Sequence, residues 1–155
     1  MPNSAIVKTK LVRSLRLAVP VLVLAVAGFL LWSIGSGEVY KTLKVDDHKY
    51  HLELASTPKE RQQGLSGRES LDQDRGMLFT YGQEGRPCFW MKDMNFSLDI
   101  IWVDAQKTVV YIEEDVAPET HPESFCPSAD ALYVIELNAG EVARIGIEVG
   151  DTLDF

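Results

Sequence analysis

The pattern of apolar and polar positions divides the chain into two unlike parts. An uninterrupted apolar run covers residues 17–34, and the segment before it has four basic side chains and no acidic one. At about 1.5 Å per helical residue the run reaches roughly 27 Å, close to the hydrocarbon thickness of a bilayer. The pattern therefore predicts a basic tail at residues 1–16 and one transmembrane helix at residues 17–34.

Basic residues on the N-terminal side alone predict a cytoplasmic N-terminus. The rest of the chain would then be extracytoplasmic, in a single-pass protein of the cell membrane. A cleaved signal peptide is the alternative, because Ala25-Val26-Ala27 has the small residues that signal peptidases recognise. The apolar run continues beyond Ala27 to Ile34, a length that a spanning helix needs and a signal peptide does not. This favours the anchor and leaves cleavage at Ala27 open.

After Gly35-Ser36-Gly37, a short flexible linker, the pattern changes to short runs of alternating polarity that are typical of β-strands. Asp46-Asp47 separates the first two runs, as a hairpin connection would. The predicted strands cover residues 39–45, 49–54, 76–81, 88–92, 98–103, 109–113, 132–137 and 151–155. Residues 114–130 contain three prolines and are predicted to form a loop.

Two short helices are predicted between the strands. Thr57 is a typical N-cap, Pro58 suits the first helical position, and Glu60 completes a capping box. The second helix follows residues 138–141 and ends at Gly146. Many short strands with two small helices predict an α+β fold: a compact, β-rich domain over residues 38–155 whose main sheet curls into a barrel-like shape.

The predicted domain is strongly acidic. Residues 38–155 carry 11 of the 15 Lys and Arg and all 23 Asp and Glu, a formal charge of −12. Such a charge repels phosphate groups, so we expect no nucleic-acid partner. Cationic ligands, or a purely solubilising role for the charge, remain open.

Cys88 and Cys126 are the only cysteines of the chain. Thiols outside the cytoplasm tend to be oxidised, so we expect a structural disulfide, worth about 3–4 kcal/mol in the chain-entropy model. A redox-active pair lacks the usual C-x-x-C spacing, and free thiols remain open. A metal site would need help from histidines, but His48 and His51 would point to opposite faces of a strand, so we expect none.

Residues 88–94 form the densest cluster of large side chains in the domain. Alternation places Phe89 and Met91 on one face, and Trp90 and Lys92 on the other. Core packing explains such a cluster in most proteins. The functional alternative is the rim of a pocket in which Lys92 holds an anionic ligand.

Two carboxylates lie among apolar residues within predicted strands. Asp99 and Glu136 are therefore candidates for buried acids, and a buried charge needs a partner. For Asp99 the candidate partners are Lys92, Arg75 and Arg68. Structural ion pairs and catalytic acid and base are the competing interpretations. Because the chain has no recognisable nucleophile, phosphate-binding or EF-hand motif, we predict no cofactor.

Six short motifs occur in one order along residues 57–151. They are T-P-x-E-R-x-x-G-L-x-G-R at 57–68, R-G-M-L-F at 75–79, F-W-M-K at 89–92, L-D-I at 98–100, E-L-N-A-G at 136–140 and G-I-x-V-G-D at 146–151. Together they resemble the bacterial and archaeal family called domain of unknown function 192. The resemblance implies a small, β-rich, barrel-like domain, often exported or membrane-anchored, with no established reaction.

Shared motif positions favour a common site within the domain. The ligand-binding candidates are Arg75, Trp90, Met91, Lys92, Asp99 and Glu136. The main hypothesis is a membrane-anchored, non-catalytic binding or accessory domain of the cell envelope, with an unknown ligand or envelope protein as partner. The second is an envelope enzyme that uses Asp99 or Glu136 with Lys92. The third is a structural or assembly role, which would require a continuous exposed apolar patch.

Overall fold

The computed structural model of the protein describes residues 40–155. The predicted basic tail, transmembrane helix and linker lie outside the described residues. No helix within residues 40–155 has the length and apolar character needed to cross a membrane.

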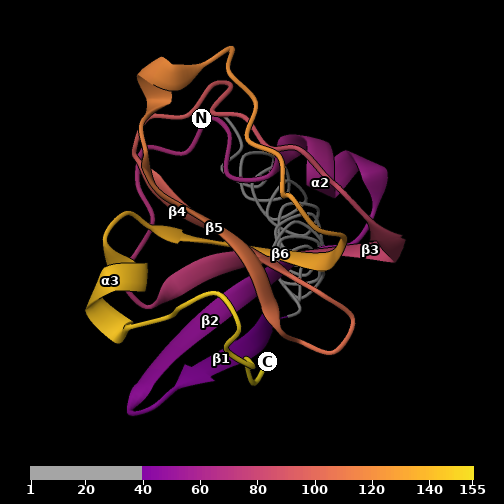
Figure 1. The fold of residues 1–155 in the computed structure, drawn as a ribbon. Coiled ribbons are helices and arrows are strands. Elements are labelled where there is room, and N and C mark those ends of the chain that lie inside the picture. Colours follow the sequence, from indigo (N-terminus) through magenta and orange to yellow (C-terminus); the bar gives the residue numbers. More distant parts are fainter. Residues whose placement is uncertain (1–39) are drawn as a thin grey trace, which may run out of the picture. The chain divides into compact units, whose positions relative to one another are not determined.

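Six strands form one open, curled sheet in the order β1-β2-β3-β6-β4-β5 (Figure 1). The strands are β1 (Tyr40–Val45), β2 (His48–Ala55), β3 (Arg75–Gly85), β4 (Leu98–Val103), β5 (Val109–Val116) and β6 (Ala131–Asn138). All neighbours are antiparallel except β2 and β3, which run parallel. The last strand in sequence, β6, therefore lies between β3 and β4 at the centre of the sheet.

The parallel connection from β2 to β3 contains helix α2 (Pro58–Gln63). Thr57 Oγ1 accepts a hydrogen bond from the Glu60 N–H at 3.2 Å, and Glu60 Oε2 accepts one from the Thr57 N–H at 2.8 Å. The predicted capping box is therefore confirmed. The second predicted helix is α3 (Glu141–Ile145), which follows Gly140 and ends at Gly146, where φ is 68°. Glycine tolerates this left-handed conformation because it has no Cβ.

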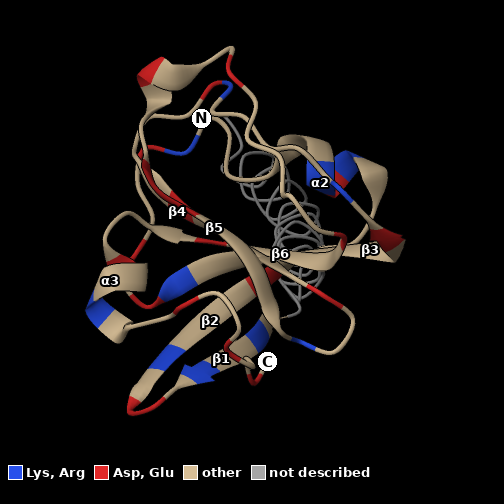
Figure 2. Ribbon diagram, in the orientation of Figure 1, with Lys and Arg blue, Asp and Glu red and all other residues tan. Residues whose placement is uncertain are grey.

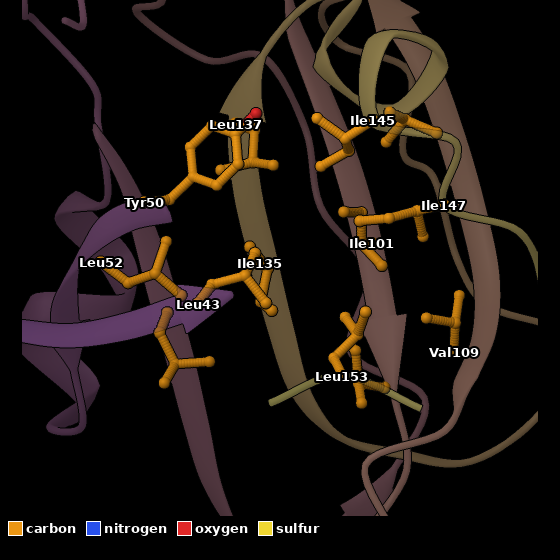
Figure 3. Packing of buried hydrophobic residues seen from close by; sticks show 13 residues of the cluster. Leu43, Tyr50, Leu52, Ile101, Val109, Ile135, Leu137, Ile145, Ile147 and Leu153 are labelled. Atoms are coloured by element: carbon orange, nitrogen blue, oxygen red, sulfur yellow. The ribbon is translucent and has the colours of Figure 1, made fainter. Parts of the chain in front are cut away.

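The sheet is packed on both faces. One face, called here the α3 face, is covered by α3 and by the C-terminal segment. Figure 3 shows the buried side chains of this face packed together across several strands. The α2 face, beside α2 and residues 86–96, has a second cluster that includes Phe79, Met91 and Trp102. Every residue of β4 is buried, since both of its faces contact a core. Two cores explain why Asp99 and Glu136 are both buried although they lie on different faces.

The predicted last strand is wrong in its extent. Residues 151–155 form only isolated bridges, Thr108↔Thr152 and Lys44↔Asp154. These bridges join the segment to β1 at one edge of the sheet and to the residue before β5 at the other. The C-terminus thus spans the gap between the edge strands at one end, and the sheet itself stays open.

The predicted strand at residues 88–92 is also absent. Only Phe89 pairs, in an isolated antiparallel bridge with Phe125. Pro87, which has no N–H to donate, precedes the segment, and the neighbouring chain is the irregular loop that follows η1 (Pro118–Thr120). The disulfide Cys88–Cys126 is confirmed and links these two irregular segments.

Candidate functional site

Glu136 lies in the middle of β6, at the centre of the sheet. It pairs with Met77 of β3 and Ile100 of β4, so its side chain projects from the α2 face. Only 6% of the residue is exposed, and its Oε2 atom has no hydrogen-bond partner. Because nearly all buried polar atoms in proteins are hydrogen-bonded, this oxygen requires an explanation.

The surroundings of Glu136 keep it neutral. Burial raises the pKa of Glu136 to about 8, and the Arg68 guanidinium opposes this shift only in part. At neutral pH most of the protein therefore has a protonated carboxyl at this position. A protonated carboxyl group can both donate and accept a hydrogen bond.

Glu136 lines a cavity of about 90 Å³ on the α2 face. The other lining residues come from α2 and the loop after it, from β3, and from residues 88–94. They are Arg61, Gln62, Gln63, Gly64, Leu65, Ser66, Phe79, Tyr81, Cys88, Phe89, Trp90 and Met94. By the measure in which about 10–15 Å³ holds one water molecule, this volume has room for roughly six to nine waters.

Trp90 is at the rim of this cavity, with 56% of its surface exposed. The residue before it, Phe89, packs edge-on against Phe79, at 4.8 Å between ring centroids, and against Trp102, at 5.8 Å. Trp102 Nε1 donates to the Pro87 carbonyl at 2.8 Å. These contacts fix the backbone on the N-terminal side of the exposed indole.

Of the six ligand-binding candidates, only Trp90 and Glu136 line this cavity. Met91 is 2% exposed and belongs to the core of the α2 face. Lys92 is exposed away from the cavity, and its carbonyl accepts a hydrogen bond from Ser66 Oγ at 2.9 Å. Arg75 lines a different surface pocket, where its guanidinium lies 4.7 Å from the ring centroid of Tyr40.

Asp99 is fully buried on the α3 face and is held by backbone groups. Its two carboxylate oxygens accept hydrogen bonds from the N–H groups of Asp115, at 2.9 Å, and Val142, at 2.8 Å. The expectation of a Lys or Arg partner for Asp99 is therefore wrong. Arg68 instead forms a two-pronged ion pair with Glu53, at 2.7 and 2.6 Å. The Val142 N–H lies in the first turn of α3, so Asp99 supplies the helix with a cap from a distant strand.

Two of the cavity residues, Arg61 and Tyr81, were not expected from the sequence. The Arg61 guanidinium lies 4.9 Å from the Tyr81 ring centroid, and its Nη1 donates to the Thr80 carbonyl at 3.0 Å. Burial raises the pKa of Tyr81, the Arg61 guanidinium opposes this in part, and Glu136 adds a smaller upward shift. Arg61 belongs to the first of the six motifs, so the sequence could have indicated it as a site residue. Tyr81 belongs to none of the motifs, and nothing in the sequence indicated its place in the cavity.

A buried polar cluster on the α3 face was also not expected. Tyr50 donates to Glu141, Arg144 bonds to both of them, and burial is the main reason that the pKa of Tyr50 is raised. All of these groups are paired, so the cluster joins β2 to α3. Within residues 40–155, no group of three His, Cys, Asp or Glu side chains is arranged to hold a metal ion.

Two solved structures resemble this domain. One is a protein of Sinorhizobium meliloti 1021 described as a candidate transcription regulator: it is 34% identical, with a TM-score of 0.68, over 76% of this chain and 97% of that one. The other is a protein of unknown function from Novosphingobium aromaticivorans DSM 12444, which is 31% identical, with a TM-score of 0.69, over 76% of this chain and 85% of that one.

No curated protein is similar to the chain. One family model matches residues 41–155, which include every strand from β2 to β6, the cavity and the disulfide: DUF192, described as "Uncharacterized ACR, COG1430". Since this match covers most of the chain, the protein belongs to the domain of unknown function 192 family.

Proposed function

We propose that residues 38–155 are a membrane-anchored, extracytoplasmic domain that binds a small ligand without transforming it, in the cavity lined by Glu136. One observation carries this proposal: Glu136, whose buried Oε2 has no hydrogen-bond partner, lines a cavity in the described domain. Leaving such an oxygen unpaired costs about 1–3 kcal/mol, and a bound ligand with a complementary group would recover it.

A second candidate function is an envelope enzyme with Glu136 as proton donor. The pKa of about 8 supports this candidate, because a general acid must be protonated near neutral pH. Asp99 cannot assist Glu136, since it projects from the α3 face and both of its oxygens are already bonded to backbone N–H groups. Lys92 does not line the cavity either. Binding is therefore the simpler role for the site.

The description of the Sinorhizobium relative raises transcription regulation, which in its usual form involves contact with DNA, as a further role. Residues 38–155 have a formal charge of −12, and Asp and Glu are spread over the strands and loops of the domain (Figure 2). Such a surface opposes contact with a phosphate backbone. We therefore do not extend that role to this chain.

The anchor part of the proposal is supported by residues 17–34 and their basic flank. It is tested by fractionating cells that express the full chain. We expect the protein to remain in the membrane fraction after alkaline extraction, and we expect protease added outside the cytoplasmic membrane to digest the domain. Release by alkaline extraction, or protection from that protease, would contradict the anchor or its orientation.

The binding site is tested by Glu136→Met, which replaces the carboxyl with an apolar group of similar length. Residues placed to bind a ligand commonly make the protein without the ligand less stable, because their polar groups are left unpaired. Since this substitution removes the unpaired carboxyl, we expect the free energy of unfolding of the domain to rise by about 1–3 kcal/mol. Glu53→Met is the matched control: Glu53 lies on the same face and in the same row across the sheet, but it is paired with Arg68. The control should lose stability. A loss in Glu136→Met as well would assign Glu136 to the fold and contradict the proposal.

A further inference from the structure

We infer that the Glu136 cavity receives the polar edge of an uncharged sugar, while the apolar face of the sugar ring lies against Trp90. This inference rests on the proposed binding function and narrows it to one chemical class of ligand. Four features of the site carry it: its hydrogen-bonding groups, its charge, its volume and its exposed aromatic rim.

The hydrogen-bonding groups of the cavity suit hydroxyl groups. Glu136, Tyr81 and Gln62 have side chains that can both donate and accept at neutral pH. Gln63 donates one N–H to the Ser66 carbonyl and keeps its other N–H and its oxygen, whereas Ser66 Oγ donates its hydrogen to the Lys92 carbonyl and can still accept. A sugar hydroxyl likewise donates one hydrogen bond and accepts others. The Glu136 carboxyl, whose Oε2 has no partner, would gain one from such a group.

The charge of the cavity disfavours ionic ligands. Glu136 is the only acid among the lining residues, and Arg61 is the only base. Arg61 is held beside the cavity by the Thr80 carbonyl and the Tyr81 ring, so an entering ammonium group would meet its guanidinium. An entering carboxylate would meet Arg61 favourably, but it would add to a domain of formal charge −12, whose repulsion opposes its entry. An uncharged ligand avoids both penalties.

The volume and the rim receive the two sides of the ligand. By the measure in which about 10–15 Å³ holds one water molecule, a cavity of about 90 Å³ has room for the hydroxyl-bearing edge of a sugar and part of its ring. The apolar face of the ring would lie at the opening, where 56% of Trp90 is exposed. His121, from the loop tied by the disulfide, contacts this indole at 6.3 Å between ring centroids. A flat apolar surface next to polar groups is the arrangement that binds an amphipathic ring.

The test uses the full-length chain in polyoxyethylene detergent micelles, because detergents with sugar head groups would compete. Glucose and N-acetylglucosamine are the uncharged probes, and glucosamine and glucuronate are their charged counterparts. The NMR resonance of the Trp90 indole N–H reports binding, and that of the buried Trp102 is the internal reference.

We expect an uncharged sugar to shift the Trp90 signal saturably, with a dissociation constant of about 1 mM. Both charged sugars should bind about tenfold more weakly. A chitotetraose titration separates the sources: tighter binding than the monosaccharide indicates a polymeric glycan, and equal binding indicates a free sugar.

Variants tie this binding to the cavity. Trp90→Ala should weaken sugar binding by about tenfold or more, followed by calorimetry, because the stacking surface is lost. Glu136→Gln keeps neutral hydrogen-bonding groups and should retain the affinity within about threefold, whereas Glu136→Met should abolish it. Tyr40→Ala is the control, since Tyr40 is also an exposed aromatic residue, at 39%, but does not line the cavity. It should leave the affinity unchanged.

The outcomes separate this inference from the proposed function. Tighter binding of glucosamine than of glucose, accompanied by proton release, would contradict an uncharged sugar as the ligand and would indicate a cation-binding site instead. No response to any sugar, together with increased stability of Glu136→Met, would overturn the ligand class alone. No response together with decreased stability of Glu136→Met would overturn both.

Discussion

Asp99 and Glu136 lie on neighbouring strands, one register position apart, and point to opposite faces of the sheet. Glu136 pairs with Ile100, and Asp99 pairs with Leu137. Paired residues share a face and successive residues alternate, so Glu136 projects from the α2 face and Asp99 from the α3 face. One acid is bonded to two backbone N–H groups, and the other lines a cavity with an unpaired oxygen. The two carboxylates therefore have separate roles and cannot act as a catalytic pair.

The first prediction concerns Asp99→Asn. An amide has one accepting oxygen, so one of the N–H groups of Asp115 and Val142 would face an NH₂ group and remain unpaired. We expect the free energy of unfolding, measured with urea, to fall by about 2–4 kcal/mol. Glu114→Gln, at an exposed position of β5, is the control and should change it by less than about 0.5 kcal/mol. A tolerated Asp99→Asn would show that Asp99 does not support α3.

The second prediction concerns the pH dependence that Glu136 introduces. Its pKa is about 8 in the folded protein against an ordinary value of 4.5, so the folded state holds the proton more tightly than the unfolded state. The stability of the domain should therefore fall as the pH rises from 4.5 to 8, by up to about 5 kcal/mol from this group. Tyr81, whose pKa is raised, stays neutral over this range.

Glu136→Gln isolates this contribution, because the amide has no proton to lose. We expect the variant and the natural protein to have similar urea midpoints at about pH 5, and the variant to be more stable at about pH 8.5. Parallel pH profiles of the two proteins would mean that Glu136 is ionised in the folded state.

The third prediction concerns the disulfide. Cys88 and Cys126 are 38 positions apart, and the bond ties the loop after η1 to the segment that presents Trp90. Reduction, or the double change Cys88→Ala and Cys126→Ala, should lower the free energy of unfolding by about 3–4 kcal/mol. Dithiothreitol should have no further effect on the double variant. Mass spectrometry of unreduced protein that found two free thiols would contradict the bond.

The fourth prediction concerns the backbone next to Glu136. A Cβ atom at Gly76 would lie 2.6 Å from the Glu136 carbonyl oxygen and 2.7 Å from methyl carbons of Leu52 and Leu137. Gly76→Ala should therefore destabilise the domain by about 1–3 kcal/mol, measured by thermal unfolding. Gly85→Ala is the matched control in the same strand, because nothing lies within 4 Å of its Cβ position. Equal melting temperatures for the two variants would show that β3 can move away from β6 at this point.

Several features of this domain are local in the sequence and could be predicted from it. Alternating polarity marked β1 and β2, short apolar runs marked β4 and β6, and the capping box at Thr57 and Glu60 marked α2. Alternation also placed Met91 and Trp90 on opposite faces, and the first is buried and the second exposed, although the segment is not a strand. These features depend on neighbours at most a few residues apart, which is why the sequence reveals them.

The partners of the buried acids depend on which strands become neighbours. Asp99 was expected to need a basic side chain, but the chain path brings the N–H groups of β5 and α3 to it. Glu136 shares a cavity with Arg61 and Tyr81, and α2, β3 and residues 88–94 surround it only because β6 lies at the centre of the sheet.

The sequence by itself determined the strand periods, the capping box, the acidic surface and the cysteine pair, because each is a local pattern or a simple count. The tertiary structure alone decided that Asp99 supports α3 while Glu136 is left unpaired in a cavity beside Trp90. The physical reason is the register of β4 against β6: a shift of one residue moves a side chain to the opposite face, and so decides which core and which partners it meets.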